Sequence, residues 1–255
     1  MSDAPLGAVA EDDPRRRLAE ALRPIISLNV SATFDDEVLT AAATALEEIG
    51  RTLASAAGPR RSRRQPDIDQ HAQEFFPASP IIGMTNPIAP PVVVHVVDGI
   101  DGGYPEIRAE AWFDWAYEGP PACVHGGVIA ETFDEMLGLA NIVAGNPGMT
   151  GTLTVRYRKP TALRRPLRIE ARCLGRDGRK IKTWAGMYDG EVLTAEADGL
   201  FIQVRPSQFL AMAEGTAAGA GPTGPGATVA DGMRVGVPAD DQLTSVVPDP
   251  ESPTT

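Results

Sequence analysis

Cysteine, histidine and aromatic residues are scarce in this sequence. Among 255 residues there are 2 cysteines, 3 histidines and 5% aromatic side chains. The two thiols, Cys123 and Cys173, are too few for a disulfide framework or a four-thiolate zinc site. We therefore expect free thiols, no bound metal and an intracellular, cytoplasmic protein whose core needs no covalent or metal cross-link.

Long hydrophobic runs and a surplus of positive charge are also missing. The longest aliphatic stretch lies near 91–97, and the acidic N-terminus lacks the basic and apolar regions of a secretion signal. We therefore expect neither secretion nor a membrane span. With 34 acidic and 23 basic residues, the formal charge is −11. Such a chain binds phosphate backbones poorly, and the arginines at 60–64 lack interleaved aromatics, so no nucleic-acid partner is expected.

Composition divides the chain into segments of different character. A polar, flexible N-terminus and a helical arm come first, and an acidic tail rich in Gly, Pro and Ala comes last; this tail is expected to be disordered. An Arg- and Pro-rich linker separates the arm from the part that carries strand patterns. The predicted boundaries are 1–12 for the N-terminus, 13–58 for the arm, 59–91 for the linker, 92–205 for the folded domain and 206–255 for the tail.

Two helices are predicted in the arm. Asp13 and Pro14 suit an N-cap followed by a first-turn proline, and Pro24 is expected to end this short helix. Thr33 with Asp36 suits the capping pair of a longer amphipathic helix. We expect the apolar face of that helix to pack on the sheet or across a dimer as a lid. This face includes Phe34, Leu46 and Leu53.

Alternating hydrophobicity predicts strands in the folded domain. The apolar run at 92–97 predicts a buried strand, and the alternation at 107–117 predicts a longer, half-buried one. Alternation returns at 150–157, where Thr150 falls on the face opposite Leu153. The Asp-Gly pairs that begin at Asp177 and Asp189 favour hairpin turns. We expect the last four strands to form an antiparallel meander.

One helix interrupts these strands. Residues 124–144 are mostly apolar with a helical period, so a helix there must be covered on nearly every side. A long apolar helix between an opening pair of strands and a meander predicts an α+β chain with a single hotdog fold. In that fold a curved antiparallel sheet wraps around the central helix.

Three carboxylates, Glu131, Asp134 and Glu135, lie in this apolar helix. Burying an ionised carboxylate without a partner is costly, so some of them must face a cleft or a solvated stripe. The HGG sequence at 125–127 lies at the helix N-terminus, where free N–H groups and the helix dipole favour an oxyanion. A solvated stripe and a catalytic site both fit this pattern.

These motifs carry a resemblance to a known family. HGGVIAETFDEMLG, TGTLTVRYRKP and the strands that follow resemble the hotdog acyl-CoA thioesterases, in particular the phenylacetyl-CoA (PaaI-like) family, over roughly residues 92 to 204. The resemblance implies Asp134 as catalytic carboxylate, Gly126 as backbone oxyanion donor and Thr150 as water-positioning hydroxyl. It also implies a homodimer or homotetramer, because the carboxylate and the glycine come from opposite subunits.

On this interpretation the chain is a thioester hydrolase of lipid or fatty acid metabolism, which converts an acyl-CoA or aryl-acyl-CoA into free acid and CoA. No separate cofactor is expected, since CoA is part of the substrate. Asp134 would act as general base or as nucleophile, and His125 would either polarise the substrate or pin its loop. Residues expected to contact the CoA part are Gly127, Arg156, Arg158, Lys159 and Pro160.

Other interpretations compete with hydrolysis. A non-catalytic hotdog dimer that binds acyl-CoA or has a regulatory role would show the same motifs. A hotdog hydratase would need an acid and a base within the segment 83–89, where this chain has Met84 and Ala89. Asn86-Pro87 is then better explained as turn chemistry. The acyl group stays open, because the side chains that could line a fatty-acyl tunnel could equally line an aryl pocket; these are Trp112, Trp115, Phe133 and Met136.

Overall fold

The structure, a computed structural model, describes residues 5–58 and 76–204. The predicted disorder of the tail at 206–255 lies outside the described residues. The arginine-rich half of the predicted linker lies outside them as well, and the expected domain division stays a prediction.

The described segments contain helices and strands in an α+β arrangement. The helices are α1 (Pro14–Ser31), α2 (Asp36–Ser55) and α4 (Gly126–Val143), with short 3-10 turns η1 (Phe76–Ala78), η2 (Ile100–Gly102) and η3 (Trp115–Tyr117). The strands are β1 (Val92–Val97), β2 (Glu106–Ala111), β3 (Gly148–Tyr157), β4 (Leu167–Asp177), β5 (Lys180–Asp189) and β6 (Val192–Gln203).

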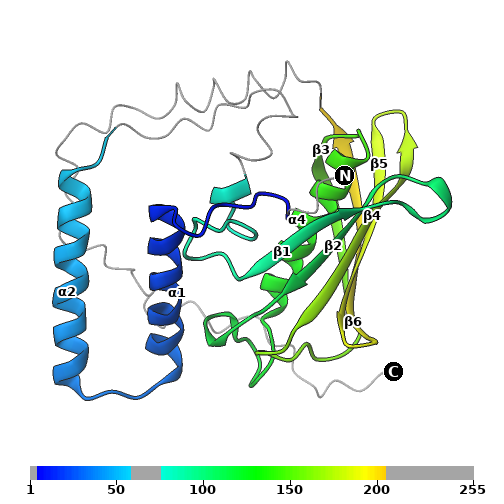
Figure 1. Cartoon of the computed structure of the whole chain (residues 1–255). Coiled ribbons are helices and arrows are strands. Elements are labelled where there is room, and N and C mark those ends of the chain that lie inside the picture. Colours follow the sequence, from blue (N-terminus) through cyan, green and yellow to red (C-terminus); the bar gives the residue numbers. More distant parts are fainter. Residues whose placement is uncertain (1–4, 59–75, 205–255) are drawn as a thin grey trace, which may run out of the picture. The chain divides into compact units, whose positions relative to one another are not determined.

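The strands form one antiparallel sheet, and α4 packs against it (Figure 1). The spatial order is β1-β2-β4-β5-β6-β3, and α4 contacts β2, β3, β4, β5 and β6. In β2 the buried and exposed side chains alternate, with Ile107, Ala109 and Ala111 buried. The curved sheet around a central helix confirms the predicted hotdog fold.

Helix α4 supplies much of the core. Its buried side chains cover more than one face of the helix, as its continuous apolar sequence predicts; they are Ile129, Thr132, Phe133, Met136, Leu137, Leu139, Ala140 and Asn141. The two Asp-Gly hairpins are also confirmed. Gly178 and Gly190 have φ angles of 57° and 58°, which glycine accepts without steric cost.

The predicted four-stranded meander is only partly correct. Strands β4, β5 and β6 follow one another, but β3 pairs with β6 at the sheet edge rather than with β4. After β3 the chain leaves the sheet: the N–H groups of Arg158 and Lys159 both donate to Thr194 O, at 2.7 and 3.0 Å. This crossover frees β4 to pair with β2 and places the whole meander between β2 and β3.

The strand predicted at 107–117 is too long. Strand β2 ends at Ala111, and the chain turns through η3 because the Asp114 carboxylate accepts a hydrogen bond from the Trp115 N–H at 2.9 Å. Phe113 keeps its predicted inward orientation and is fully buried.

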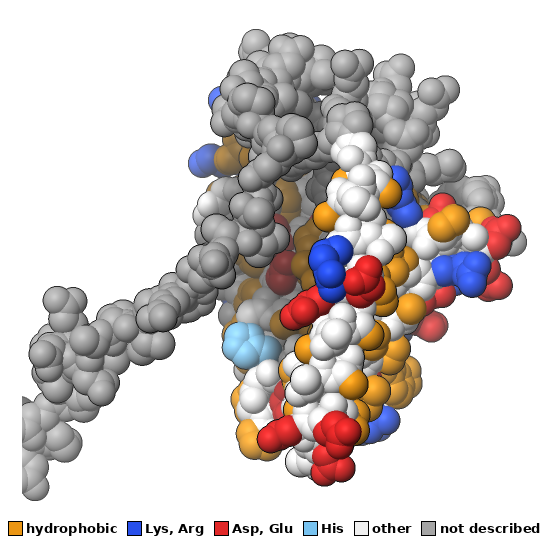
Figure 2. Space-filling view, turned by 90° about the vertical axis from the view of Figure 1, so that its left-hand side faces the viewer, with side chains coloured by type: hydrophobic (Ala, Val, Ile, Leu, Met, Phe, Trp, Pro, Cys, Tyr) orange, Lys and Arg blue, Asp and Glu red, His pale blue; other side chains and the backbone are white. Residues whose placement is uncertain are grey.

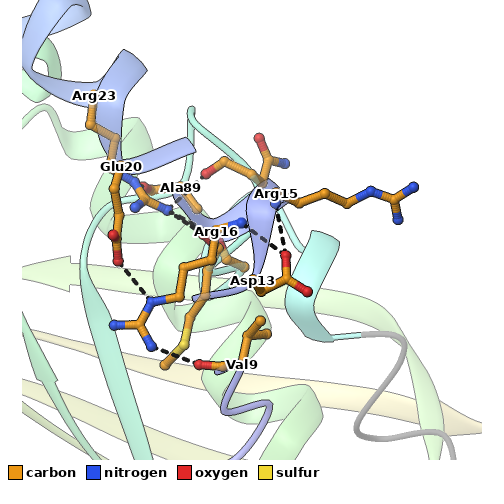
Figure 3. A network of polar contacts seen from close by, with 10 residues as sticks. Val9, Asp13, Arg15, Arg16, Glu20, Arg23 and Ala89 are labelled. Carbon is orange, nitrogen blue, oxygen red and sulfur yellow. Dashed lines mark hydrogen bonds and ion pairs between the residues drawn. The ribbon is translucent and has the colours of Figure 1, made fainter. Parts of the chain in front are cut away.

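Helix α1 begins as predicted and ends later than predicted. The Asp13 side chain caps the helix by accepting from the N–H groups of Arg15 and Arg16, at 2.8 and 3.2 Å (Figure 3). Pro24 lies inside α1, which continues to Ser31, so the expectation that this proline stops the helix is wrong. Proline has no N–H to donate within the helix. Arg23, directly before it, anchors this turn through its side chain.

That anchor is a set of four hydrogen bonds. The Arg23 guanidinium donates to the carbonyl oxygens of Ala89 (3.0 Å), Gly83 (3.2 Å), Met84 (3.2 Å) and Asn86 (3.0 Å). The segment 83–89 therefore presents four backbone carbonyl oxygens to the guanidinium group. The Asn86 side chain accepts from the Ile88 N–H at 3.2 Å, which agrees with turn chemistry.

Helix α2 differs from the prediction at its start and in its packing. Its N-cap is Asp35 rather than Thr33, and no side chain caps it within the described residues. Its large hydrophobic side chains are exposed, among them Val38, Leu39, Ile49 and Leu53. In Figure 2, hydrophobic side chains lie along the edges of this helix, and its front carries charged and other polar side chains. No residue of α2 is buried, so the expected packing of Leu53 and its neighbours on the sheet is not seen within the described chain.

Candidate active site

The predicted carboxylate and the predicted hydroxyl meet in the structure. Asp134 lies in the middle of α4, and Thr150 lies near the start of β3. The Thr150 hydroxyl donates a hydrogen bond to Asp134 Oδ1 at 2.7 Å. Asp134 is half-buried and Thr150 is exposed, so this pair can be reached from solvent.

A β-bulge brings Thr150 to this position. In the pairing of β3 with β6, Thr150 lies opposite Phe201 and Thr152 lies opposite Leu200, so Gly151 is the extra residue. Phe201 faces α4 and is buried, whereas Leu200 lies on the other face. The alternation had placed Thr150 on the face opposite Leu153. That expectation is wrong, because one extra residue reverses the face of every side chain before it.

The N-terminus of α4 forms a second group of predicted residues. His125 is the N-cap, and its Nδ1 accepts from the Gly127 N–H at 3.0 Å. In neutral His125 the proton is therefore on Nε2. The Gly126 N–H makes no hydrogen bond within the described residues, and free N–H groups here are what an oxyanion requires.

Tyr157 packs against this helix end. Its hydroxyl donates to Gly126 O at 2.7 Å. A Cβ added to Gly126 would lie 3.3 Å from the Tyr157 Cζ and hydroxyl oxygen, so the position has little room for a side chain. The contact of Tyr157 with this helix end was not predicted from the sequence.

The two groups are separated along the helix. Gly126 and Asp134 are eight residues apart in α4, which corresponds to roughly 12 Å at the α-helical rise per residue. One thioester carbonyl cannot contact both within a single chain, since reacting groups must come within about 3–3.5 Å.

A pocket of about 310 Å³ opens beside Asp134. It is mainly apolar, and its polar side chains are those of Asp134, Glu135 and Thr150. Its lining residues are Phe76, Asp134, Glu135, Gly138, Leu139, Ile142, Gly148, Met149 and Thr150. A mainly apolar pocket with a few placed polar groups is typical of small-molecule sites.

Glu135 and Ser79 form a contact that the sequence did not predict. The Ser79 hydroxyl donates to Glu135 Oε1 at 2.9 Å and accepts from the N–H groups of Ile81 and Ile82, at 3.1 and 3.3 Å. Ser79 belongs to the predicted linker, where nothing in the sequence marked it. Glu131, the remaining carboxylate of α4, is exposed.

The arginines predicted to contact CoA are held by carboxylates on β6. Arg156 forms an ion pair with Asp198, and Arg158 forms one with Glu196. The hydrogen bond from Arg158 lowers the pKa of Glu196 below its ordinary value, and the hydrogen bond to Asp198 raises the pKa of Arg156.

Other predicted contacts lie at the same end of β3. Lys159 and Pro160 are exposed, and Gly127 is exposed beside the N-cap histidine. Glu118, the ionisable residue before HGG, accepts from the Ala122 N–H at 2.6 Å. This bond stabilises a turn in which Ala122 has a φ of 60°.

Neither a metal cluster nor a spanning helix is found in the described part of the chain. No three His, Cys, Asp or Glu side chains at 5–58 and 76–204 are grouped to hold a metal ion. Both cysteines are free, with Cys173 buried and Cys123 half-buried. None of the helices described is long and apolar enough to cross a bilayer.

Comparison with known proteins adds sequence relatives for part of the chain. Acyl-coenzyme A thioesterase THEM4 of Xenopus laevis is 35% identical over 91 residues, which are 35% of this chain and 41% of the relative. The protein of that name from Mus musculus is 33% identical over 95 residues, which are 36% and 41% of the two chains. The chain thus spans about two-fifths of the length of these curated relatives. No family model matches.

A solved structure matches over a larger region. The crystal structure of a thioesterase superfamily protein has a TM-score of 0.68 and 29% sequence identity to this chain. The match covers 78% of this chain and 96% of that protein. It therefore extends well beyond the region that the curated relatives share.

Proposed function

We propose that this chain, a member of the hotdog-fold thioesterase superfamily, hydrolyses acyl-CoA thioesters to a free acid and CoA. The observation that carries the proposal is the hydrogen bond between Thr150 and Asp134 at the edge of a mainly apolar pocket. It joins a carboxylate that can activate water to a pocket that can hold an acyl group. The partial match to two acyl-coenzyme A thioesterases supports the same substrate class.

Asp134 is the proposed base or nucleophile. Thr150 has one hydroxyl proton and donates it to Asp134, so toward a water molecule it can only accept. A water that donates one proton to Thr150 and the other to Asp134 would be held with an oxygen lone pair free to attack the thioester carbon. Direct attack by Asp134 would instead form a mixed anhydride, which water then hydrolyses.

The Gly126 N–H is the proposed oxyanion donor. It lies at the first residue of α4, where the helix dipole adds to the hydrogen bond. The thiolate of CoA leaves without strong acid assistance. The proposed role of the His125 side chain is structural, because its Nδ1 accepts a hydrogen bond from the Gly127 N–H and so fixes the helix end.

Two copies of the chain are needed for this chemistry. Asp134 and Gly126 of one copy are roughly 12 Å apart, so one thioester cannot use both. A homodimer or larger homo-oligomer in which Asp134 of one subunit faces Gly126 of another would complete the site.

The test measures the hydrolysis of a panel of acyl-CoAs by detecting the free thiol of the released CoA. Asp134→Asn keeps the shape and removes the base, so kcat is expected to fall by at least a hundredfold with an unchanged Tm. Glu131→Gln is the matched control, because it replaces an exposed carboxylate on the same helix by an amide, and it should retain wild-type turnover. Near wild-type turnover of Asp134→Asn would refute the assignment. Binding of acyl-CoA without thiol release by the wild type would support the non-catalytic alternative.

A further inference from the structure

We propose that Phe76 limits the length of the acyl group that the pocket accepts, and that the N-terminal residues 5–9 hold Phe76 in place. This inference rests on the proposed function, since it concerns the acyl group of the same substrate. It assigns a role in specificity to residues that precede the hotdog domain.

Phe76 is part of the pocket wall. It lies in the 3-10 turn η1, is 4% exposed and lines the pocket with Leu139, Ile142 and Met149. A volume of about 310 Å³ is at the lower end of the range for ligand pockets. A phenyl ring in the wall of this pocket takes space that a longer acyl chain would need.

The N-terminal segment packs directly behind Phe76. Gly7 is buried with a φ of 70°, and a Cβ added there would lie 2.8 Å from the Phe76 Cβ. Real Cβ atoms do not approach so closely, so only glycine lets the two segments touch. The next residue back, Leu6, donates its N–H to Val94 O of β1 at 2.8 Å.

Helix α1 fixes the other end of this segment. Arg16 donates through Nη1 to Val9 O at 2.6 Å and through Nε to Glu20 at 2.8 Å. Figure 3 shows this network, in which the Arg16 side chain lies between Glu20 and Val9. Residues 5–9 are thus held at β1 and at α1, with Gly7 pressed on Phe76 between the two.

The segment after Phe76 is tied to α4. Phe76 O accepts from the Ser79 N–H at 3.0 Å, and the Ser79 hydroxyl donates to Glu135, which also lines the pocket. Ser79 is 2% exposed. Phe76 is therefore held from both sides and cannot swing away from the pocket without breaking one of these contacts, which makes it a fixed wall.

The experiment measures kcat/KM for saturated acyl-CoAs from acetyl to palmitoyl and for phenylacetyl-CoA. Phe76→Ala should raise the ratio of long-chain to short-chain kcat/KM at least tenfold while short-chain turnover persists. Phe76→Trp should lower that ratio. If Phe76→Ala fails to fold, Phe76→Leu gives a smaller change in the same direction. An unchanged ratio in folded Phe76 variants would overturn the proposal.

A matched pair of glycine variants tests the support. Gly7→Ala places a methyl group against Phe76, whereas Gly102→Ala imposes similar backbone strain at a φ of 75° with nothing within 4 Å. Gly7→Ala should move the chain-length ratio away from the wild-type value, because the added methyl group displaces Phe76, and Gly102→Ala should leave it at the wild-type value. Equal ratios in both variants would contradict the role of residues 5–9.

Non-hydrolysable S-alkyl-CoA thioethers separate this inference from the proposed function. Their Kd values can be measured by calorimetry whether or not the protein turns over. If the wild type hydrolyses none of the panel but Phe76→Ala gains affinity for long alkyl chains, the proposed function fails and the role of Phe76 stands. If Kd shows the same length dependence in both proteins, the role of Phe76 is refuted.

Discussion

Replacing Arg23 by methionine is expected to destabilise the protein more than any other change to an arginine of α1. The hydrogen bonds from one charged group to four carbonyl oxygens would be lost. Gly83 O and Asn86 O would keep a backbone N–H donor, whereas Met84 O and Ala89 O would lose the guanidinium donor. A hydrogen bond from a charged donor contributes ~1.5–3 kcal/mol, but such contributions are not additive.

Two features reduce the total below the sum of four bonds. Burial lowers the pKa of Arg23, which shows that its charge loses hydration on folding, and the side chain is only half-buried, so water can replace part of the lost donors. We expect a loss of about 3 kcal/mol in the free energy of unfolding. For a domain of this size that corresponds to a decrease of roughly 6–12 °C in Tm.

The assay is thermal and urea unfolding of Arg23→Met, Arg23→Lys and Arg51→Met. Lysine has one nitrogen and cannot copy the spread of guanidinium donors, so it should recover only part of the loss. Arg51 makes an exposed ion pair with Glu48 and is the matched control, with an expected change within about 0.5 kcal/mol. A Tm for Arg23→Met within about 1 °C of the Arg51→Met value would refute the reasoning.

Three further predictions concern the site, the core and pH. Gly126→Ala should leave the fold intact but lower kcat/KM about tenfold or more, measured by thiol release, because its Cβ would press on the Tyr157 ring and shift the oxyanion donor. Asn141 is fully buried, and its side chain makes no hydrogen bond within the described residues, so Asn141→Leu should raise the free energy of unfolding by about 1–2 kcal/mol; a decrease in urea unfolding would contradict this. Burial raises the pKa of Tyr117 to about 12, so its contribution to stability is complete below about pH 10 and is lost as pH rises through about 12. Because Tyr117 is partly solvated, we expect about 1–2 kcal/mol, and Tyr117→Phe should show a flatter stability curve over this range in urea titrations.

The central helix and the hairpins could be predicted because their signals are local. An apolar helical stretch such as α4 has to be covered, and Gly178 and Gly190 satisfy turns whose backbone few other residues accept. The roles of Asp134 and Thr150 were predicted only through the family resemblance, and their hydrogen bond was not predicted. On the alternation alone, Thr150 was assigned to the wrong face.

The errors share a physical cause, which is that distant contacts override a local pattern. Pro24 stays helical beside Arg23, whose acceptors lie some sixty residues away. Strand β3 lies beside β6 because of a crossover connection, and no residue type in the sequence predicts that crossover. Phe76 and Ser79 lie in a segment whose composition indicated only a linker, and they acquire a role because α4 and residues 5–9 close around them.

The bulge at Gly151 separates the spacing of the site residues along the chain from the faces of the sheet on which they lie. Deleting this one glycine would keep Asp134, Thr150 and every other site residue in the sequence, and β3 could still pair with β6 in a regular register. Thr150 would stay opposite Phe201 and would still face α4, so its pair with Asp134 would survive the loss of the bulge. The face of Thr150 is therefore set by its pairing with Phe201, and a chain with one residue fewer at this point could present the same pair from a regular strand.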